Sequence, residues 1–99
     1  RIFLTDEESY NEDPDRIRAM VCQGIEKTKK SHKMTEVADR RQAISQALQT
    51  AARGDTVLIT GMGHEQYRIV NGKRIPWNDK AVVSEIITEI SRENRKISL

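Results

Sequence analysis

The sequence predicts an α/β domain whose sheet is mostly parallel. Short apolar segments alternate with segments of helical periodicity along most of the chain, which is the order that βαβ units produce. One segment, 56–60, is a continuous β-branched and aliphatic run, as expected of a strand buried on both faces of a parallel sheet. With 99 residues, 36% of them hydrophobic, the chain can build one modest core, so residues 1–99 are predicted to form a single domain.

The first half of the chain predicts a strand, a helix and a second strand. Residues 2–5 are an apolar run typical of a short buried strand, and an acidic loop follows over 6–15. Asp13 and Pro14 predict a helix start, because Asp accepts free backbone N–H groups and Pro suits the first helical position. Residues 33–37 predict another short strand. The helix between them has an apolar face made of Ile17, Met20, Val21, Gly24 and Ile25.

A second helix and the clearest strand come next. Asp39, with Gln42 three residues later, is a variant capping box that predicts the helix start. Gly54 predicts the helix end, since glycine accepts a left-handed backbone. Segment 56–60 is then predicted as the best-defined strand. The apolar face of this helix consists of Ala43, Ile44, Ala47, Leu48, Ala51 and Ala52.

A hairpin and a last helix complete the domain. Residues 67–70 and 73–77 flank an Asn-Gly dipeptide, the strongest short signal for a hairpin turn. Asn78 or Asp79 is predicted to cap the final helix, whose polar tail is expected to fray. The buried stripe of that helix is predicted to be Val82, Val83, Ile86, Ile87 and Ile90.

Composition argues against several classes of function. The net charge of +2, from 17 Lys and Arg against 15 Asp and Glu, is too mild to predict nucleic-acid or membrane binding. No apolar run approaches the roughly 20 residues of a membrane span. Cys22 is the single cysteine, so an internal disulfide is excluded, and a reducing, cytoplasmic setting fits. With His32 in a lysine-rich turn, no metal site is predicted.

Two chemically unusual loops are predicted to lie together. Loops 6–11 and 61–66 follow apolar strands, and the carboxyl ends of parallel strands are where such sheets bind ligands. In the second loop, glycine would let a ligand approach the backbone. Glu65 would accept a hydrogen bond from a cationic group, and His64 could donate or accept a hydrogen bond. On this pattern alone, an ordinary solvent-exposed turn is the better interpretation, because a lone Gly-x-Gly is a weak motif.

The surrounding motifs resemble a known family. Residues 52–67 read Ala-Arg-Gly-Asp-Thr-Val-Leu-Ile-Thr-Gly-Met-Gly-His-Glu-Gln-Tyr and resemble the GD-x-VL(I/V)-x-GKGHE-x-Y run of the Mur ligases. Further matches occur in family order at Thr5-Asp6, Glu12-Asp13-Pro14, Asp39-Arg40, Ala43-Ile44 and Asn78-Asp79-Lys80. The resemblance covers nearly all of 2–90. The match is to the C-terminal, amino-acid-binding domain of the branch usually called MurE, and it implies that the domain is incomplete at its N-terminus.

The resemblance implies an ATP-dependent amide-bond ligase of peptidoglycan synthesis. In that family ATP, with Mg²⁺, activates the D-glutamate carboxylate of UDP-N-acetylmuramoyl-dipeptide, and the amino group of a diamino acid attacks it. The C-terminal domain holds the amino acid, which assigns Gly61 and Glu65 to its binding, with Asp6, Gly63 and His64 in support. The chain has no GxxxxGK[ST] phosphate loop, which the family carries in its central domain. The chain alone is therefore expected to be inactive, to hold no catalytic residue, and to work with the rest of the same polypeptide.

Departures from the family pattern affect the choice of amino acid. Glu8, Ser9 and Tyr10 replace the family's Asn-Pro-Arg, whose arginine contacts the distal carboxylate of meso-diaminopimelate, and Met62 replaces its lysine. With Glu7 beside them, these residues predict a site for a cationic tip, so L-lysine or L-ornithine is favoured over meso-diaminopimelate. Alternatives remain a sister ligase such as a folylpolyglutamate synthase, against which the combined motifs count, and a non-catalytic α/β binding module.

Four other features have plainer interpretations. The basic run 27–33 is interpreted as a solvated helix end, and Trp77 as a packing residue at the hairpin. Cys22 is predicted to be a small core residue. The acidic cluster in 6–15 is attributed to amine recognition and helix capping rather than to Mg²⁺. The sequence offers no role for Arg40.

Overall fold

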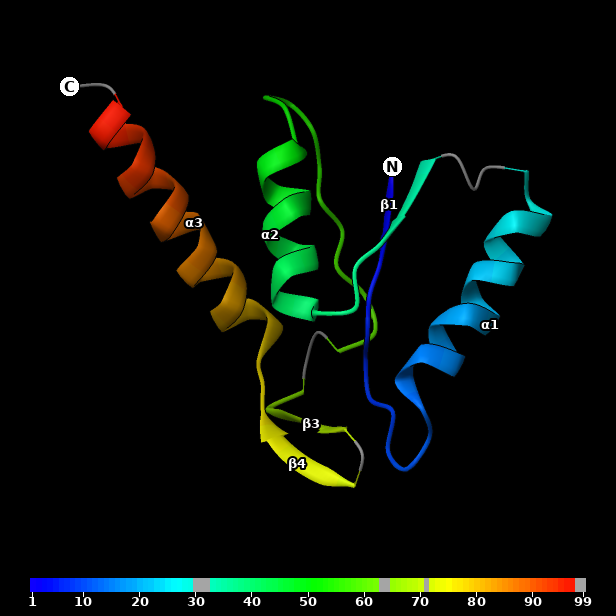
Figure 1. The fold of residues 1–99 in the computed structure, drawn as a ribbon. Coiled ribbons are helices and arrows are strands. Elements are labelled where there is room, and N and C mark those ends of the chain that lie inside the picture. The colour runs from blue at the N-terminus through cyan, green and yellow to red at the C-terminus, as the bar shows by residue number, and fades with distance from the viewer. Residues whose placement is uncertain (30–32, 63–64, 71, 98–99) are drawn as a thin grey trace.

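The computed structural model describes residues 1–29, 33–62, 65–70 and 72–97, and its elements follow the predicted order with one exception. Strand β1 (Ile2–Leu4) leads into helix α1 (Pro14–Lys27), strand β2 (Met34–Glu36) and helix α2 (Arg40–Thr50). The hairpin strands β3 (Tyr67–Val70) and β4 (Lys73–Pro76) precede helix α3 (Asp79–Ile97). Figure 1 shows α1 on one side of β1 and β2, α2 and α3 on the other, and the hairpin at one end.

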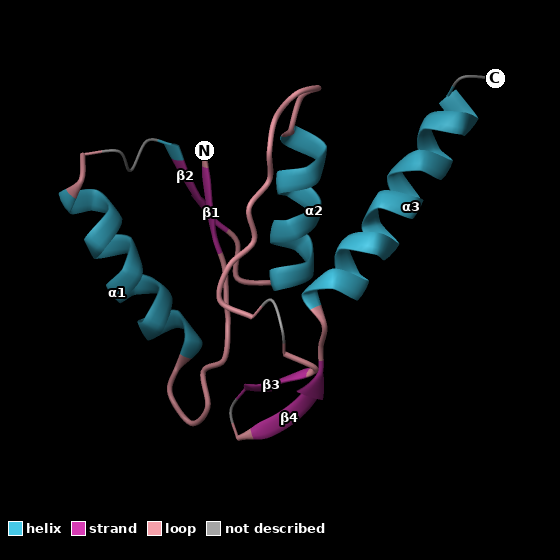
Figure 2. Cartoon of the chain, turned by 180° about the vertical axis from the view of Figure 1, so that it is seen from behind, coloured by secondary structure: helices cyan, strands magenta, loops and turns pink. Residues whose placement is uncertain are grey.

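The sheets are smaller than predicted. Strands β1 and β2 pair in parallel, with Ile2 opposite Met34, and β3 and β4 pair antiparallel. Segment 56–60, predicted as the clearest strand, forms no strand and has an extended course beside α2 (Figure 2). A strand needs a neighbour to bond to, and β1 and β2 pair only with each other within the described residues. The α/β class is confirmed, with β1 and β2 as the parallel pair within the described residues.

The predicted helix starts are confirmed. The Asp13 side chain accepts from the Asp15 backbone N–H, and the Asp39 side chain accepts from the Gln42 N–H at 2.9 Å. Asn78, rather than Asp79, caps α3 by accepting from the Ala81 N–H at 2.9 Å. The cap positions were predictable because they depend on local sequence.

Two helix ends and one apolar face differ from the prediction. Helix α2 ends at Thr50, and Gly54 takes its left-handed conformation, with φ of +90°, in the turn that follows. Helix α3 continues through its polar tail to Ile97. Helix α1 buries no residue, and Met20 is 63% exposed on its predicted inner face. Cys22 is likewise only half-buried and is not a core residue.

A small core forms between α2 and α3. Ile44, Val82 and Ile86 are its buried members. The side chains packed against them are Leu48, Ile59, Trp77, Val83 and Ile90. Ile87, predicted to be buried, is 49% exposed. Among the described residues, no helix has the length and apolar character needed to cross a bilayer.

Candidate functional site

The two predicted loops meet at the carboxyl end of β1. Gly61 has φ of +99°, a conformation that glycine adopts at little cost. The Glu7 carboxyl group lies against Gly61 so closely that a Cβ atom at this position would overlap its Cδ and both its oxygens. Gly61 therefore serves two purposes, since it turns the backbone and leaves room for Glu7. The acidic loop and the glycine loop are in direct contact.

The hairpin holds the acidic loop in place. The backbone N–H groups of Ser9 and Tyr10 both donate to the Ile69 carbonyl of β3, each at 3.0 Å. The Gly72 N–H donates to the Tyr10 carbonyl at 2.8 Å. Tyr10 itself has φ of +52°, which is uncommon for a residue other than glycine. The sequence did not reveal this support, because backbone groups make it and side-chain types do not specify it.

The surroundings of Tyr10 are acidic. Its side chain is 56% exposed at the outer rim of the loop. A hydrogen bond with the Glu8 carboxylate, the charge of that carboxylate and, more weakly, the charge of Glu65 raise the pKa of the Tyr10 hydroxyl. Tyr10, Glu8 and Glu65 are thus close enough to interact, although 57 positions separate the last two along the chain. The group as a whole suits a cation and disfavours an anion.

Arg40 connects both loops to the start of α3. Its guanidinium group is 2% exposed and donates to both carboxylate oxygens of Asp79, at 2.9 and 2.7 Å. It also donates to the Asp6 carbonyl at 3.2 Å and to the Thr60 carbonyl at 3.0 Å. Those two carbonyls stand where the acidic loop and the glycine loop begin. Arg40, for which the sequence gave no role, therefore fixes the position of each loop relative to the other.

Asp79, the partner of Arg40, accepts hydrogen bonds from two residues. Burial by itself raises the pKa of Asp79, but hydrogen bonds from Arg40 and Trp77 outweigh that effect and lower the pKa. The Trp77 indole N–H donates to Asp79 at 2.6 Å. Trp77 also packs against the core between α2 and α3, which confirms its predicted packing role. Arg68 lies over the Trp77 ring at 4.8 Å. Burial, followed by repulsion from Arg40, lowers the pKa of Arg68.

The Asp6 carboxylate forms an ion pair within the fold. Its carboxylate accepts from Arg18 of α1 at 2.5 Å, and Arg18 also donates to Glu36 of β2 at 2.6 Å and to Asp15. This ion-pair cluster joins the acidic loop to α1 and β2. Asp6 therefore has a role inside the fold, and the supporting role predicted for it toward a ligand stays a prediction.

Three other residues of the glycine loop need separate mention. Gly63 and His64, predicted to support the site, lie outside the described residues. Met62, which stands where the related family has lysine, is 1% exposed. Its side chain packs in the interior, so the substitution changes the core beneath the loop and places no methionine at the surface. In the described part of the chain no three His, Cys, Asp or Glu side chains gather as a metal cluster would require.

Comparison with known proteins gives a consistent result. The family model described as "Mur ligase, glutamate ligase domain" matches residues 1–63. Ligases named UDP-N-acetylmuramoyl-L-alanyl-D-glutamate–2,6-diaminopimelate ligase are similar over most of the chain. The one from Rickettsia montanensis is 38% identical over 86 residues, covering 87% of this chain and 17% of the relative. The one from Caldanaerobacter subterraneus is 38% identical over 87 residues, covering 88% of this chain and 18% of the relative.

A solved structure agrees with these matches. A structure of UDP-N-acetylmuramoyl-L-alanyl-D-glutamate–2,6-diaminopimelate ligase superimposes with a TM-score of 0.80 and 38% identity. The superposition covers 90% of this chain and 18% of that one. The present chain therefore spans less than a fifth of the length of the proteins it matches.

Proposed function

The chain belongs to the Mur ligase family, and on that premise we propose that it forms the acceptor-binding part of a cytoplasmic, ATP-dependent ligase of peptidoglycan precursor synthesis. The complete polypeptide would add a diamino acid to UDP-N-acetylmuramoyl-L-alanyl-D-glutamate. The relatives named above carry this dipeptide and a diamino acid in their names. The remaining part of the polypeptide would bind the dipeptide and the nucleotide.

The contact between the acidic loop and the glycine loop carries this proposal. Glu7 lies against Gly61, and Glu8 and Glu65 both act on Tyr10. Carboxylates gathered at a glycine turn suit an amino acid that carries two amines, because one ammonium can be bound while the other amine reacts. A charge-assisted hydrogen bond to a carboxylate is among the stronger polar contacts available to such a ligand.

The chemical role of these residues is to position the acceptor. In the ligase reaction the α-amino group of the acceptor attacks an activated carboxyl group, so that amine must be neutral and correctly placed. The acidic group would keep the distal amine protonated and bound, which leaves the α-amino group as the nucleophile. Holding two reactants in the correct geometry supplies a large part of the rate enhancement in such bimolecular reactions.

The nucleotide is expected to bind elsewhere in the complete polypeptide. The sequence of this chain has no GxxxxGK[ST] phosphate loop. In the described residues no acidic cluster with the composition of a metal site occurs either. ATP and Mg²⁺ are therefore assigned to parts of the polypeptide outside these 99 residues.

The narrower proposal is a preference for L-lysine or L-ornithine. The relatives do not support it, because each of those named above is a 2,6-diaminopimelate ligase. Its support is the local charge, since Glu8 and Glu65 flank Tyr10 where the family arginine would stand. A second carboxylate on the acceptor would meet like charge there, and such repulsion disfavours its binding.

An assay of amide-bond formation by the full-length polypeptide tests the function. Product is expected only when ATP, UDP-N-acetylmuramoyl-L-alanyl-D-glutamate and a diamino acid are all present. Omitting any of the three should abolish ADP release and product together. A polypeptide that binds these compounds without forming product would point to the non-catalytic module instead, and product from a folate acceptor would point to a sister ligase.

The amino-acid preference has its own measurement. We expect kcat/KM to be about 10²-fold or more higher for L-lysine or L-ornithine than for meso-diaminopimelate. The double substitution Glu8→Asn with Tyr10→Arg should shift the ratio toward meso-diaminopimelate, because it removes the repulsion and restores the guanidinium. If wild-type enzyme favours meso-diaminopimelate, the narrower proposal is wrong and the ligase proposal is unaffected.

A further inference from the structure

Arg68 of β3 is an arginine at the acidic loop whose charge no carboxylate of the described residues neutralises. In the described part of the chain, three arginines donate to Asp6 of that loop: Arg18 to its carboxylate, and Arg40 and Arg68 to its carbonyl. Carboxylates neutralise Arg18, in its ion-pair cluster, and Arg40, in the buried pair with Asp79. Arg68 has no such ion pair with any described residue.

The hydrogen bonds of Arg68 are also incomplete. Its Nη1 donates to the Asp6 carbonyl at 3.5 Å, beyond the usual range of about 2.7–3.2 Å. Its Nε–H is buried and finds no acceptor among the described residues, and the buried Ser9 hydroxyl likewise has no partner there. The Ser9 backbone N–H bonds to Ile69, the residue next to Arg68, so both unfilled groups belong to the junction of the acidic loop with β3. Buried polar groups are rarely left unpaired, so this junction lacks a polar partner.

The guanidinium group of Arg68 is held in a position that suits an anion. It lies over the Trp77 ring at 4.8 Å, and the Trp77 indole is fixed by its bond to Asp79 at 2.6 Å. Burial and the charge of Arg40 lower the pKa of Arg68, but an arginine remains charged at neutral pH. A partly desolvated charge without a counter-ion is unfavourable, and a carboxylate can relieve it through two parallel N–H···O bonds.

The acceptor amino acid carries an anion of this kind. Every α-amino acid has a carboxylate beside the amine that reacts in the proposed ligase. Glu8 and Glu65 act on Tyr10, toward one end of the acidic loop, where a carboxylate would be repelled. Arg68 contacts the same loop where it begins, at Asp6. The loop thus has negative charge for an amine at one end and an unneutralised positive charge at the other.

We propose that Arg68 binds the α-carboxylate of the acceptor amino acid. The inference rests on the proposed function and deepens it, because it names the group that orients the reacting end of the acceptor. The Nε–H of Arg68 would donate to one carboxylate oxygen, which supplies the partner that the junction lacks. L-Lysine, L-ornithine and meso-diaminopimelate all carry an α-carboxylate, so the assignment does not depend on which of them is preferred.

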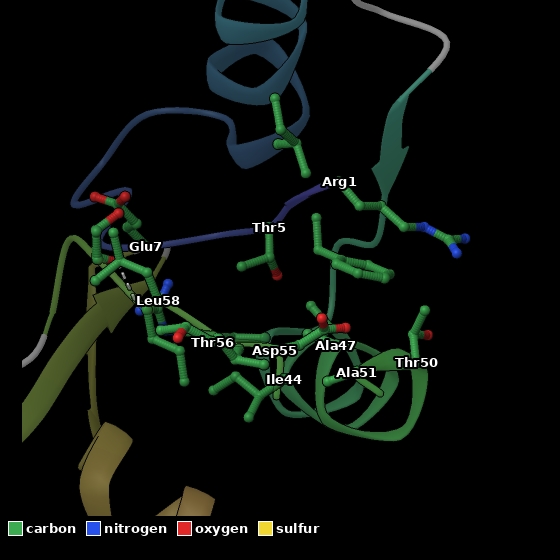
Figure 3. Close-up of a pocket in the computed structure, with 17 residues that line it drawn as sticks. Arg1, Thr5, Glu7, Ile44, Ala47, Thr50, Ala51, Asp55, Thr56 and Leu58 are labelled. Carbon is green, nitrogen blue, oxygen red and sulfur yellow. Dashed lines mark hydrogen bonds between the residues drawn. The ribbon is translucent and has the colours of Figure 1, made fainter. Parts of the chain in front are cut away.

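The proposed carboxylate site is separate from the cavity beside β1. That cavity measures about 740 Å³, and Figure 3 shows Glu7 and Leu58 among the side chains that line it. Arg40 lines it as well, but its guanidinium is already paired with Asp79. Arg68 is not among the lining residues, and the Glu7 carboxylate would repel an anion at that wall. The acceptor carboxylate is therefore expected at Arg68 and not in the cavity.

A cycle of paired enzyme and substrate changes in the full-length polypeptide tests the contact. The enzyme change is Arg68→Met, and the substrate change converts the α-carboxylate of the preferred diamino acid to a carboxamide, as in L-lysinamide for L-lysine. Wild-type kcat/KM should be about 10- to 100-fold lower for the amide, because the amide loses the charge-assisted contact. In Arg68→Met the two compounds should be used nearly equally. Any effect of the amide on the α-amine itself is common to both enzymes and cancels in the cycle.

The stability of the same variant separates a binding role from a structural one. Arg68→Met should leave the urea midpoint nearly unchanged or raise it, because it removes a partly buried charge that has no counter-ion. Arg74→Met is the matched control, since Arg74 also stacks on an aromatic ring of the hairpin, Tyr67, at 3.7 Å. The control should retain the wild-type discrimination between acid and amide. If Arg68→Met does not fold, Arg68→Gln, which also removes the charge, replaces it in the cycle.

The results that would overturn the proposal differ from those that would overturn the ligase function. Product formation with the same acid-to-amide ratio in wild type and Arg68→Met would show that the Arg68 assignment alone is wrong. A lower urea midpoint with unchanged acceptor kinetics would have the same meaning, because Arg68 would then only support the hairpin. A raised KM for ATP in place of the acceptor would also overturn it, since the bound anion would be a phosphate. No product with any diamino acid would overturn the proposed function and this inference together.

Discussion

At the scale of single residues, Arg40 explains most of the geometry of the candidate site. It is 2% exposed and forms a bidentate ion pair with Asp79. It also donates hydrogen bonds to the carbonyls of Asp6 and Thr60, where the two loops begin. Arg41, the next residue, is 41% exposed and pairs with Glu85 and Glu89 on the surface of α3. Two adjacent arginines on one helix thus differ in burial, so the stability losses on replacing each of them can be compared directly.

Arg40→Met should destabilise the protein far more than Arg41→Met. Removing Arg40 leaves the buried Asp79 carboxylate without a cation, although Trp77 still donates to it, and breaking a buried ion pair in this way costs about 3–5 kcal/mol. Breaking an exposed pair costs about 1 kcal/mol or less. Urea unfolding of the two variants at neutral pH measures both values. Similar losses for the two variants would show that Arg40 does not hold the site.

The pH dependence of stability should report on Asp79. Its pKa is lowered in the folded state, so its stabilising contribution is complete above the ordinary aspartate pKa of about 3.9 and is lost as the pH falls through the lower, folded value. The wild-type urea midpoint should therefore fall below about pH 4. Asp79→Asn should remove this component, and so should Arg40→Met. An Asp79→Asn variant with unchanged acid sensitivity would contradict the assignment.

At the scale of elements, the features that depend on neighbouring residues agree with the sequence prediction. The features that depend on contacts distant along the chain do not. The caps of α1 and α2 and the hairpin about Gly72 depend on neighbouring residues, and their positions were predictable from the sequence. Segment 56–60 has the composition of a strand, but a strand also needs a partner, and the described residues pair none with it. The burial predicted for α1 failed for the same reason, since an apolar face is buried only if another element covers it.

The contact between the two loops was predictable in outline only. Parallel strands that end at one edge predicted that loops 6–11 and 61–66 would meet, and Glu7 against Gly61 confirms it. The support from the Ile69 carbonyl was not predictable because backbone groups make it, and the role of Arg40 was not because its partners are distant along the chain. The charged residues of the loops could be identified in the sequence, whereas the contacts that fix the loops in position could not.

Comparing Gly61→Ala with Gly54→Ala should distinguish the effect of backbone strain from the effect of disturbing the contact with Glu7. Both glycines have positive φ, +99° and +90°, so each substitution should cost about 1–3 kcal/mol of stability. Only at Gly61 would the new Cβ overlap a side chain, that of Glu7, since nothing lies within 4 Å at Gly54. In the full-length polypeptide Gly61→Ala should lower kcat/KM for the acceptor by about 10²-fold, and Gly54→Ala should leave it nearly unchanged. Equal kinetic effects would argue against the contact.

At the scale of the whole molecule, the proposed function assigns these 99 residues one part of the work of a larger ligase. A small core joins α2 to α3, and an apolar cavity remains open beside β1. The acceptor loops are organised, whereas the sequence offers no phosphate loop for a nucleotide. This division of labour agrees with the share of its relatives that the chain covers.

The isolated chain should neither bind ATP tightly nor hydrolyse it. The reason is the missing phosphate-binding loop, because without such a cradle of backbone N–H groups the nucleotide phosphates have no prepared site. Calorimetric titration of the purified 99-residue chain with ATP and Mg²⁺, with a phosphate-release assay alongside, measures this. The full-length polypeptide is the positive control. ATPase activity in the isolated chain would contradict the proposed division.

The measurement that tests the central claim most directly is the effect of Glu65→Gln on the two Michaelis constants of the full-length ligase. Loss of one charge-assisted hydrogen bond should cost about 1.5–3 kcal/mol, so the KM for the acceptor amino acid should rise about 10- to 150-fold. The KM for ATP should change little, because the proposal places the nucleotide in another part of the polypeptide. A rise of both constants by the same factor, or of neither, would contradict the assignment of these loops to the acceptor.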